Sequence, residues 1–112
     1  MTDLSASRVA FLGARTMFGL LLTSQLAFTT TYAGSVSAGK MLYQSHCESC
    51  HGESGRPVMP GSPDFTRGDG LFQADSSLFE TIRSSKNIMH GFEGILRNEE
   101  IFDIVAYIRT LF

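Results

Sequence analysis

The sequence of 112 residues has no tryptophan, only two cysteines and only three prolines. Two cysteines are too few for a zinc site with four cysteine ligands or for a framework of several disulfides. Nine lysines and arginines stand against eleven acidic residues without any basic cluster, so the sequence does not indicate a nucleic-acid-binding protein. The single pair of cysteines is therefore the most informative feature of the chain.

Both cysteines belong to the motif Cys47-Glu48-Ser49-Cys50-His51, which has the spacing C-x-x-C-H. Two thiols one short turn apart can form thioether bonds with the two vinyl groups of a haem, and a histidine directly after the second cysteine then falls beneath the iron. We predict covalent attachment of one haem c through Cys47 and Cys50, with the neutral imidazole of His51 as the proximal iron ligand.

Two other uses of the cysteine pair fit the sequence less well. A thioredoxin-like dithiol needs a strand before it and a helix after it, whereas a stretch rich in glycine and proline follows here. A zinc site with two cysteines and two histidines would need His46 or His90 as a further ligand, and no H-x3-5-H spacing accompanies the pair. Haem attachment is the favoured interpretation.

Residues 1–33 have the features of a secretory signal peptide. Two arginines precede an apolar stretch at 17–28, and the small residues Thr31 and Ala33 occupy the two positions that a signal peptidase reads. An apolar core of about twelve residues would span about 18 Å as a helix, short of the ~30 Å hydrocarbon layer, which disfavours an uncleaved anchor. We predict cleavage after Ala33, a periplasmic or secreted location, and no stable membrane insertion afterwards.

Cleavage would leave residues 34–112 as one domain of 79 residues. Its seven basic and ten acidic residues give a formal charge near −3. A domain this small buries little apolar surface, and such domains commonly need a disulfide, a metal or a cofactor for stability. A flat, apolar haem at the centre would meet that need.

The apolar residues of the domain recur at helical spacing. We predict a first helix that begins with Ser37 as N-cap and leads into the haem motif, a second over residues 75–83 capped by Asp75, and a third of about fourteen residues capped by Asn98. Gly39, inside the first helix, indicates either the close approach of another element or a frayed helix end. No alternating run of strand length occurs in the domain, so we predict an all-α fold.

The segment 52–71 carries five glycines and three prolines and is predicted to be an irregular loop. Such a stretch inside a compact domain usually serves a site. We predict that it covers the proximal side of the haem. The carbonyl of Pro60 or Pro63 would accept a hydrogen bond from the free N–H of His51 and so fix the ring.

The second axial ligand decides what the haem does, because a bound thioether suits electron transfer whereas a vacant position admits oxygen or peroxide. Met59 follows His51 by eight residues, which leaves only a short path to the opposite face of the ring. Met89 follows His51 by 38 residues, on a loop between two predicted helices. His90 could ligate by its imidazole instead, which would lower the reduction potential. The residues alone leave Met89 and His90 both open.

These motifs resemble the class I c-type cytochromes, in particular the small exported monohaem cytochromes of bacteria. The resemblance covers essentially all of residues 34–112. The matching positions are Gly39, Leu42, Tyr43, the haem motif with Gly52, Met89 with Gly91 and Phe92, and the stretch 99–109. The resemblance implies a small cytochrome c fold, with three or four short helices and loops wrapped around one covalently bound haem.

The resemblance also assigns roles to individual residues. It implies that Cys47 and Cys50 attach the haem, that His51 is the proximal ligand and that Met89 is the distal one. It implies a close contact between the first and last helices, at Gly39, Tyr43 and Tyr107. His90 departs from the family pattern, because proline commonly follows the ligand methionine.

The principal hypothesis is a soluble periplasmic electron carrier that exchanges electrons with redox partner proteins. No constellation of general acid, base and nucleophile is present, so we predict that the protein is not an enzyme. Two alternatives stay open. One is a haem protein with a labile or His90-ligated sixth position, acting as a peroxidase or gas sensor, and the other is a cytochrome subunit of a larger oxidoreductase.

Overall fold

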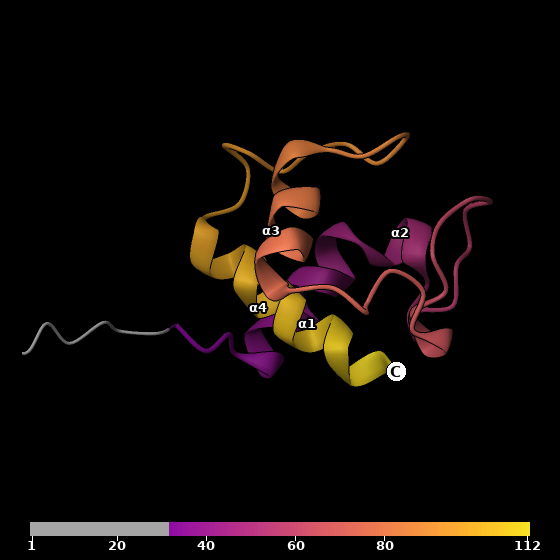
Figure 1. Cartoon of the computed structure of the whole chain (residues 1–112), viewed down its shortest axis with the longest axis horizontal. Helices are drawn as coiled ribbons and strands as arrows, with labels where there is room; N and C mark the ends of the chain where they lie inside the picture. Colours follow the sequence, from indigo (N-terminus) through magenta and orange to yellow (C-terminus); the bar gives the residue numbers. More distant parts are fainter. Residues whose placement is uncertain (1–31) are drawn as a thin grey trace, which may run out of the picture.

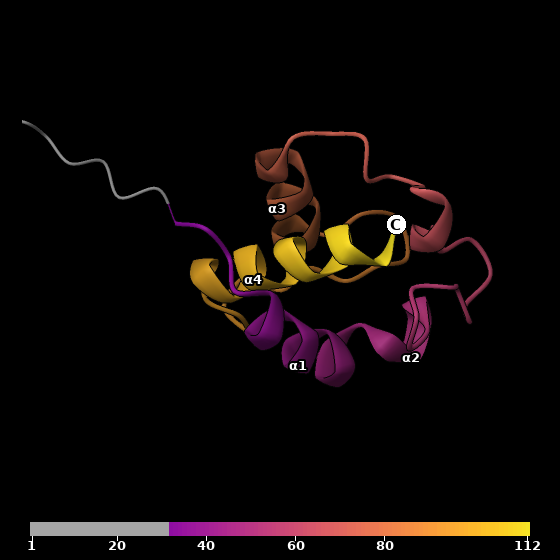
Figure 2. The same ribbon diagram turned by 90° about the horizontal axis from the view of Figure 1, so that it is seen from below.

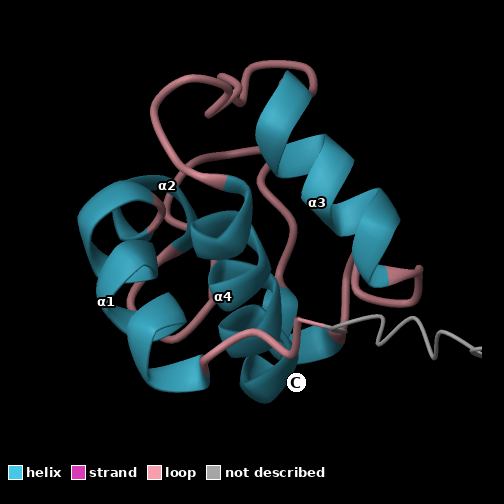
Figure 3. Ribbon diagram, turned by 90° about the vertical axis from the view of Figure 1, so that its left-hand side faces the viewer, coloured by secondary structure: helices cyan, strands magenta, loops and turns pink. Residues whose placement is uncertain are grey.

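A computed structural model describes residues 32–112, so the predicted signal peptide lies outside the described residues except for Tyr32 and Ala33. The elements follow in the order α1 (Val36–His46), α2 (Glu48–His51), the 3₁₀ turn η1 (Phe65–Arg67), α3 (Asp75–Ser84), α4 (Asn98–Ile108) and the 3₁₀ turn η2 (Arg109–Leu111). Over this range the chain forms helices and loops, with two isolated β-bridges and no strand (Figure 3). The predicted all-α fold is confirmed.

Helices α1 and α4 cross at the centre of the fold (Figure 1), and α3 contacts α4 from another side (Figure 2). The crossing is close because α1 has Gly39 there: a Cβ on this residue would lie 1.9 Å from the carbonyl oxygen of Asp103. Next to it, the rings of Tyr43 and Tyr107 meet edge to face with centroids 5.2 Å apart. The expected contact between the first and last helices is confirmed.

The core gathers along α4, whose Ile101, Ile104 and Val105 are almost fully buried. Helix α3 contributes Leu78, Phe79 and Ile82 to the same cluster. Burial of a side chain of this size stabilises a fold by about 1.5–3 kcal/mol, so the apolar periodicity of the two helices accounts for their position. None of the helices within residues 32–112 combines the length and the apolar character needed to cross a membrane.

The first helix begins earlier than predicted. Ser35, not Ser37, caps α1, because its hydroxyl accepts a hydrogen bond of 3.3 Å from the amide of Ala38. The amide of Ser35 also donates to Asp103 on α4 at 2.6 Å. This long-range bond selects one serine over the other, and the local sequence pattern does not reveal it.

The caps predicted for the other two helices are also wrong by one residue. Asp75 is the first residue of α3 and Ala74 precedes it as the cap. Helix α4 begins at Asn98, with Arg97 as the cap, and the Arg97 amide donates to the Glu100 carboxylate at 2.8 Å. Asp75 is instead paired with Arg109 at 2.6 Å, so its carboxylate joins α3 to the end of the chain.

The loop from 52 to 71 is irregular, as predicted, apart from η1. Arg109 in η2 ties the end of this loop to the C-terminal segment. Its guanidinium donates to the carbonyl oxygens of Leu71 and Gln73 as well as to Asp75. The loop that borders the candidate site is therefore held against the helix that carries the core.

Candidate haem site

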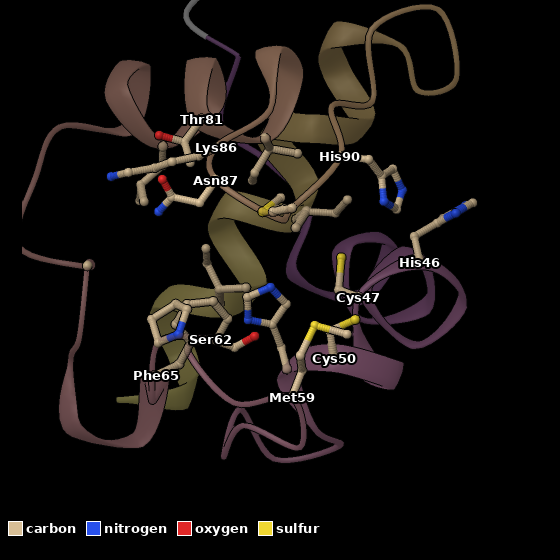
Figure 4. Close-up of a pocket in the computed structure, with 18 of the residues that line it drawn as sticks. His46, Cys47, Cys50, Met59, Ser62, Phe65, Thr81, Lys86, Asn87 and His90 are labelled. Carbon is tan, nitrogen blue, oxygen red and sulfur yellow. The ribbon is translucent and has the colours of Figure 1, made fainter.

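A cavity of about 430 Å³ opens between the end of α1, the loop before α3 and the loop after α3 (Figure 4). This volume lies within the range of about 300–1,000 Å³ that cofactor sites occupy. Most of its walls are apolar or aromatic side chains, including Tyr43, Phe65, Leu78, Ile82, Phe92, Ile104 and Ile108. All four residues predicted for the haem site, Cys47, Cys50, His51 and Met89, line this one cavity.

One helical turn positions the cysteine motif. The amide of Cys47 closes α1 with a bond of 2.8 Å to the carbonyl of Tyr43, and the amide of His51 donates to the carbonyl of Cys47 at 2.9 Å. Cys47 is buried, Cys50 is half-buried, and no disulfide joins them. Burial raises the pKa of Cys47 to about 12, so this sulfur remains a thiol at neutral pH. Figure 4 shows both cysteines on the same side of the pocket.

One ring nitrogen of His51 is left without a hydrogen bond. Its Nδ1 is buried and has no hydrogen-bond partner among residues 32–112. A buried polar atom left unpaired costs about 1–3 kcal/mol. Burial also lowers the pKa of His51, which favours the neutral imidazole that binds metals.

The hydrogen bond predicted from His51 to a proline carbonyl is not formed. Nδ1 of His51 has no partner, so neither Pro60 nor Pro63 accepts its proton. The loop is held instead through the carbonyl of Cys50, which accepts the amides of two loop residues at 3.0 Å each. The His51 ring stacks on Phe65, with centroids 4.9 Å apart and planes 10° from parallel. A face-to-face contact fixes the ring where we expected a hydrogen bond.

Tyr43 holds the residue that follows His51. Its hydroxyl donates to the carbonyl of Gly52 at 2.7 Å, and the whole side chain is buried. Sequence reasoning placed Tyr43 only at the helix crossing and missed this bond. The spacing does not reveal this bond, because α1 ends at His46 and a separate helical turn, α2, carries the motif.

Met89 reaches the cavity on a tight turn. The amides and carbonyls of Lys86 and Met89 exchange two hydrogen bonds of 3.1 and 3.0 Å, and Asn87 between them has a φ of 57°. Gly91 then passes so close to α3 that a Cβ there would lie 2.6 Å from the carbonyl oxygen of Arg83. Met89 is half-buried and packs against the hydrophobic core. The turn and the close approach together place its side chain at the cavity.

The competing ligand candidates also line the cavity. His90 is exposed, and its ring lies against Phe92 with centroids 4.6 Å apart. The ring of His46 meets the same phenylalanine edge to face, with centroids 5.9 Å apart. Figure 4 shows His46 and His90 near each other at one side of the pocket. Met59 is 39% exposed and belongs to the loop bound to the cysteine motif. Within the described range, no three His, Cys, Asp or Glu side chains gather where they could hold a metal ion, so the weaker zinc hypothesis gains no support.

The model of the family described as "Cytochrome C oxidase, cbb3-type, subunit III" matches residues 34–108. The chain belongs to this cytochrome c family. Three proteins named cytochrome c6 are among its relatives. That of Nostoc sp. is 26% identical over 101 residues, which covers 82% of this chain and 89% of the relative. That of Limnospira maxima is 29% identical over 82 residues, with coverage of 67% and 91%, and that of Gracilaria tenuistipitata is 27% identical over 82 residues, with coverage of 70% and 74%.

Membership in the cytochrome c family confirms the resemblance to class I monohaem cytochromes. The cytochrome c6 relatives are electron carriers, not enzymes, and the family implies a covalently bound haem c. Three features of the cavity fit such a group: two free thiols within one turn, a histidine in its lining whose pKa is lowered by burial, and largely apolar walls.

Proposed function

We propose that the chain is an exported electron carrier in which Cys47 and Cys50 hold haem c by thioether bonds and His51 and Met89 are its axial ligands. The observation that carries this proposal is the single cavity of about 430 Å³ that all four side chains line. When bound, the haem supplies a one-electron couple between ferrous and ferric iron. The chain's own residues orient the ring, exclude water from it and supply the two donor atoms.

Burial and local bonding favour Met89 over its rivals. Its side chain is half-buried and contacts the core, whereas His90 is exposed with its ring on Phe92. Met59 belongs to a loop whose amides are tied to Cys50, directly beside His51. A second donor to a haem held by His51 would have to come from a segment other than this loop, and the turn that carries Met89 is such a segment.

The proposed location is the periplasm, reached through a signal peptide at residues 1–33 that is cleaved after Ala33. Residues 34–112 would then carry a formal charge near −3. A mildly acidic surface is suited to transient association with basic redox partner proteins, and salt should weaken that association.

The test is a redox titration of the exported, purified protein together with acid-acetone extraction of its haem. We expect one reversible one-electron transition and haem that stays with the polypeptide after extraction. Haem that is extracted, or rapid turnover of peroxide without a partner protein, would contradict the proposal.

A cytochrome subunit of a larger oxidoreductase is the second candidate, because the matched family is described as a subunit of an oxidase. The two candidates differ in what the protein is bound to in its native cell. An electron carrier should be recovered alone after mild extraction, at the mass of a monomer with one haem. Stable recovery in one complex with further subunits would favour the second candidate.

A further inference from the structure

Asp103 is the only charged side chain that is buried within residues 32–112, with 6% of its surface exposed. Its Oδ1 accepts the hydroxyl of Tyr32 at 2.8 Å and the amide of Ser35 at 2.6 Å. None of the ion pairs formed by the described residues involves this carboxylate. Burial of a charge without a counter-charge is costly, so a cation beside this carboxylate would stabilise the fold.

The backbone just ahead of α1 lies directly against α4 beside this carboxylate. A Cβ on Gly34 would lie 2.3 Å from the carbonyl oxygen of Phe102 and 3.0 Å from the Cβ of Ala106, so only glycine fits. Gly34 precedes Ser35, whose amide nitrogen already contacts Asp103. Because consecutive amide nitrogens are about 3–4 Å apart, the nitrogen of Gly34 lies within about 6 Å of the same oxygen.

We propose that signal-peptide cleavage creates an ion pair between the new α-ammonium group of Gly34 and the carboxylate of Asp103. The inference rests on the proposed cleavage after Ala33. A signal peptidase hydrolyses the Ala33–Gly34 amide with one water molecule, which leaves a carboxylate on Ala33 and a protonated amine on Gly34. Tyr32 departs with the released peptide, so its hydroxyl no longer occupies Oδ1.

The exchange gives the buried carboxylate the cation that the described chain does not supply. Opposite charges within about 4–6 Å stabilise the charged form of each group, so the paired amine holds its proton more firmly than a free one. Asp103 also lies at the α1–α4 crossing, where its carbonyl faces Gly39. The mature N-terminus would therefore be fixed at the contact that sets the position of α1.

The test measures how fast the N-terminal amine of the exported holoprotein is acylated at neutral pH. Intact mass first establishes the initial residue, and the mass of the N-terminal peptide then gives the extent of acetylation over time, with Lys86 as an internal standard. The variant is Asp103→Asn, and the matched control is Glu99→Gln, another acidic residue of α4 that is exposed. We expect about tenfold faster acylation in Asp103→Asn and a change of less than about twofold in Glu99→Gln.

A second variant covers the case in which Asp103→Asn does not fold. One alanine inserted between Ala33 and Gly34 moves the amine about 3.8 Å further along the chain and leaves Asp103 and Ser35 unchanged. We expect this protein also to be acylated several times faster than the wild type.

The outcomes separate this inference from the proposals on which it rests. Equal acylation rates in the two proteins, with Gly34 as the first residue of the wild type and the inserted alanine as the first residue of the variant, would overturn the ion pair and leave cleavage and electron transfer standing. An initial residue other than Gly34 would overturn the ion pair and the cleavage site together, while the haem spectrum still reports on the electron carrier.

Discussion

The two sides of the candidate haem cavity are built in different ways. On the side that we propose to be proximal, Cys47, Cys50 and His51 come from one turn, and the stacking of His51 on Phe65 fixes the imidazole ring. On the side that we propose to be distal, Met89 is the one proposed ligand and lies on a turn of four residues. The proximal side is thus specified by residues adjacent in sequence, whereas the distal side depends on how a loop is attached to another helix.

That attachment is made mainly by backbone, with one exposed ion pair between Arg83 of α3 and Glu93 of the loop at 3.1 Å. After the turn, the amides of Phe92 and Glu93 donate to the carbonyls of Ile82 and Arg83 at 3.1 and 3.0 Å, and Gly91 lies against the same end of α3. We therefore expect that a variant without Met89 keeps its haem, whereas a variant without the cysteines of the haem motif loses the haem altogether.

The double variant Cys47→Ala/Cys50→Ala should have the largest effect. Without the thiols no thioether can form, and the small domain loses the group that fills its cavity. We expect no haem to remain on the polypeptide after acid-acetone extraction. Ser49→Ala, in the same turn but exposed, should keep its haem. Covalent haem in the double variant would contradict the proposed attachment through Cys47 and Cys50.

Met89→Ala should open the distal side and leave the haem attached. We expect the reduced variant to bind carbon monoxide, which the wild type resists, because the sixth position loses its thioether. His90→Ala is the matched control and should resemble the wild type. If His90→Ala opens the site and Met89→Ala does not, the distal ligand is the histidine.

Gly91→Ala tests the attachment of the distal loop. The added Cβ would meet the carbonyl of Arg83 at 2.6 Å, so the loop must move away from α3. We expect a loss of about 2 kcal/mol in the free energy of unfolding, measured by denaturant titration. Ile88→Ala, 72% exposed in the same loop, should change the stability little. Equal stability of the Gly91→Ala variant and the wild type would show that the close approach does not hold the loop.

Tyr43→Phe should have the smallest effect, confined to the proximal side. Removal of its hydrogen bond to Gly52 should cost about 1 kcal/mol. Burial raises the pKa of Tyr43 above the ordinary 10.0, so its contribution is complete below pH 10 and decreases as the pH rises above that value. The difference in unfolding free energy between the two proteins should therefore narrow above pH 10. A difference in unfolding free energy that grows in favour of the wild type above pH 10 would contradict the stabilising role of the protonated Tyr43 hydroxyl.

The sequence predicted those parts of the site that depend on local pattern. The C-x-x-C-H spacing predicted that Cys47, Cys50 and His51 belong to one site, and all three line one cavity. Gly39 left a close approach and a frayed helix end open, and the structure shows the close approach, at Asp103. The all-α class followed from the apolar spacing and is confirmed.

The sequence did not reveal features that depend on contacts between distant segments. Ser35 caps α1 because Asp103 holds its amide, although Ser37 satisfies the same local pattern. The stacking of His51 on Phe65, fourteen positions away, replaced the predicted bond to a proline carbonyl. The preference for Met89 over His90 in our proposal rests on burial in the folded chain, which adjacent positions in a sequence do not show.

The most direct test of the His51–Met89 assignment is the far-red absorption spectrum of the purified, oxidised wild-type protein. We expect the weak band that arises when a methionine sulfur is bound to ferric haem, and we expect it to vanish in Met89→Ala and persist in His90→Ala. Absence of the band from the wild type, or its persistence in Met89→Ala, would contradict the assignment.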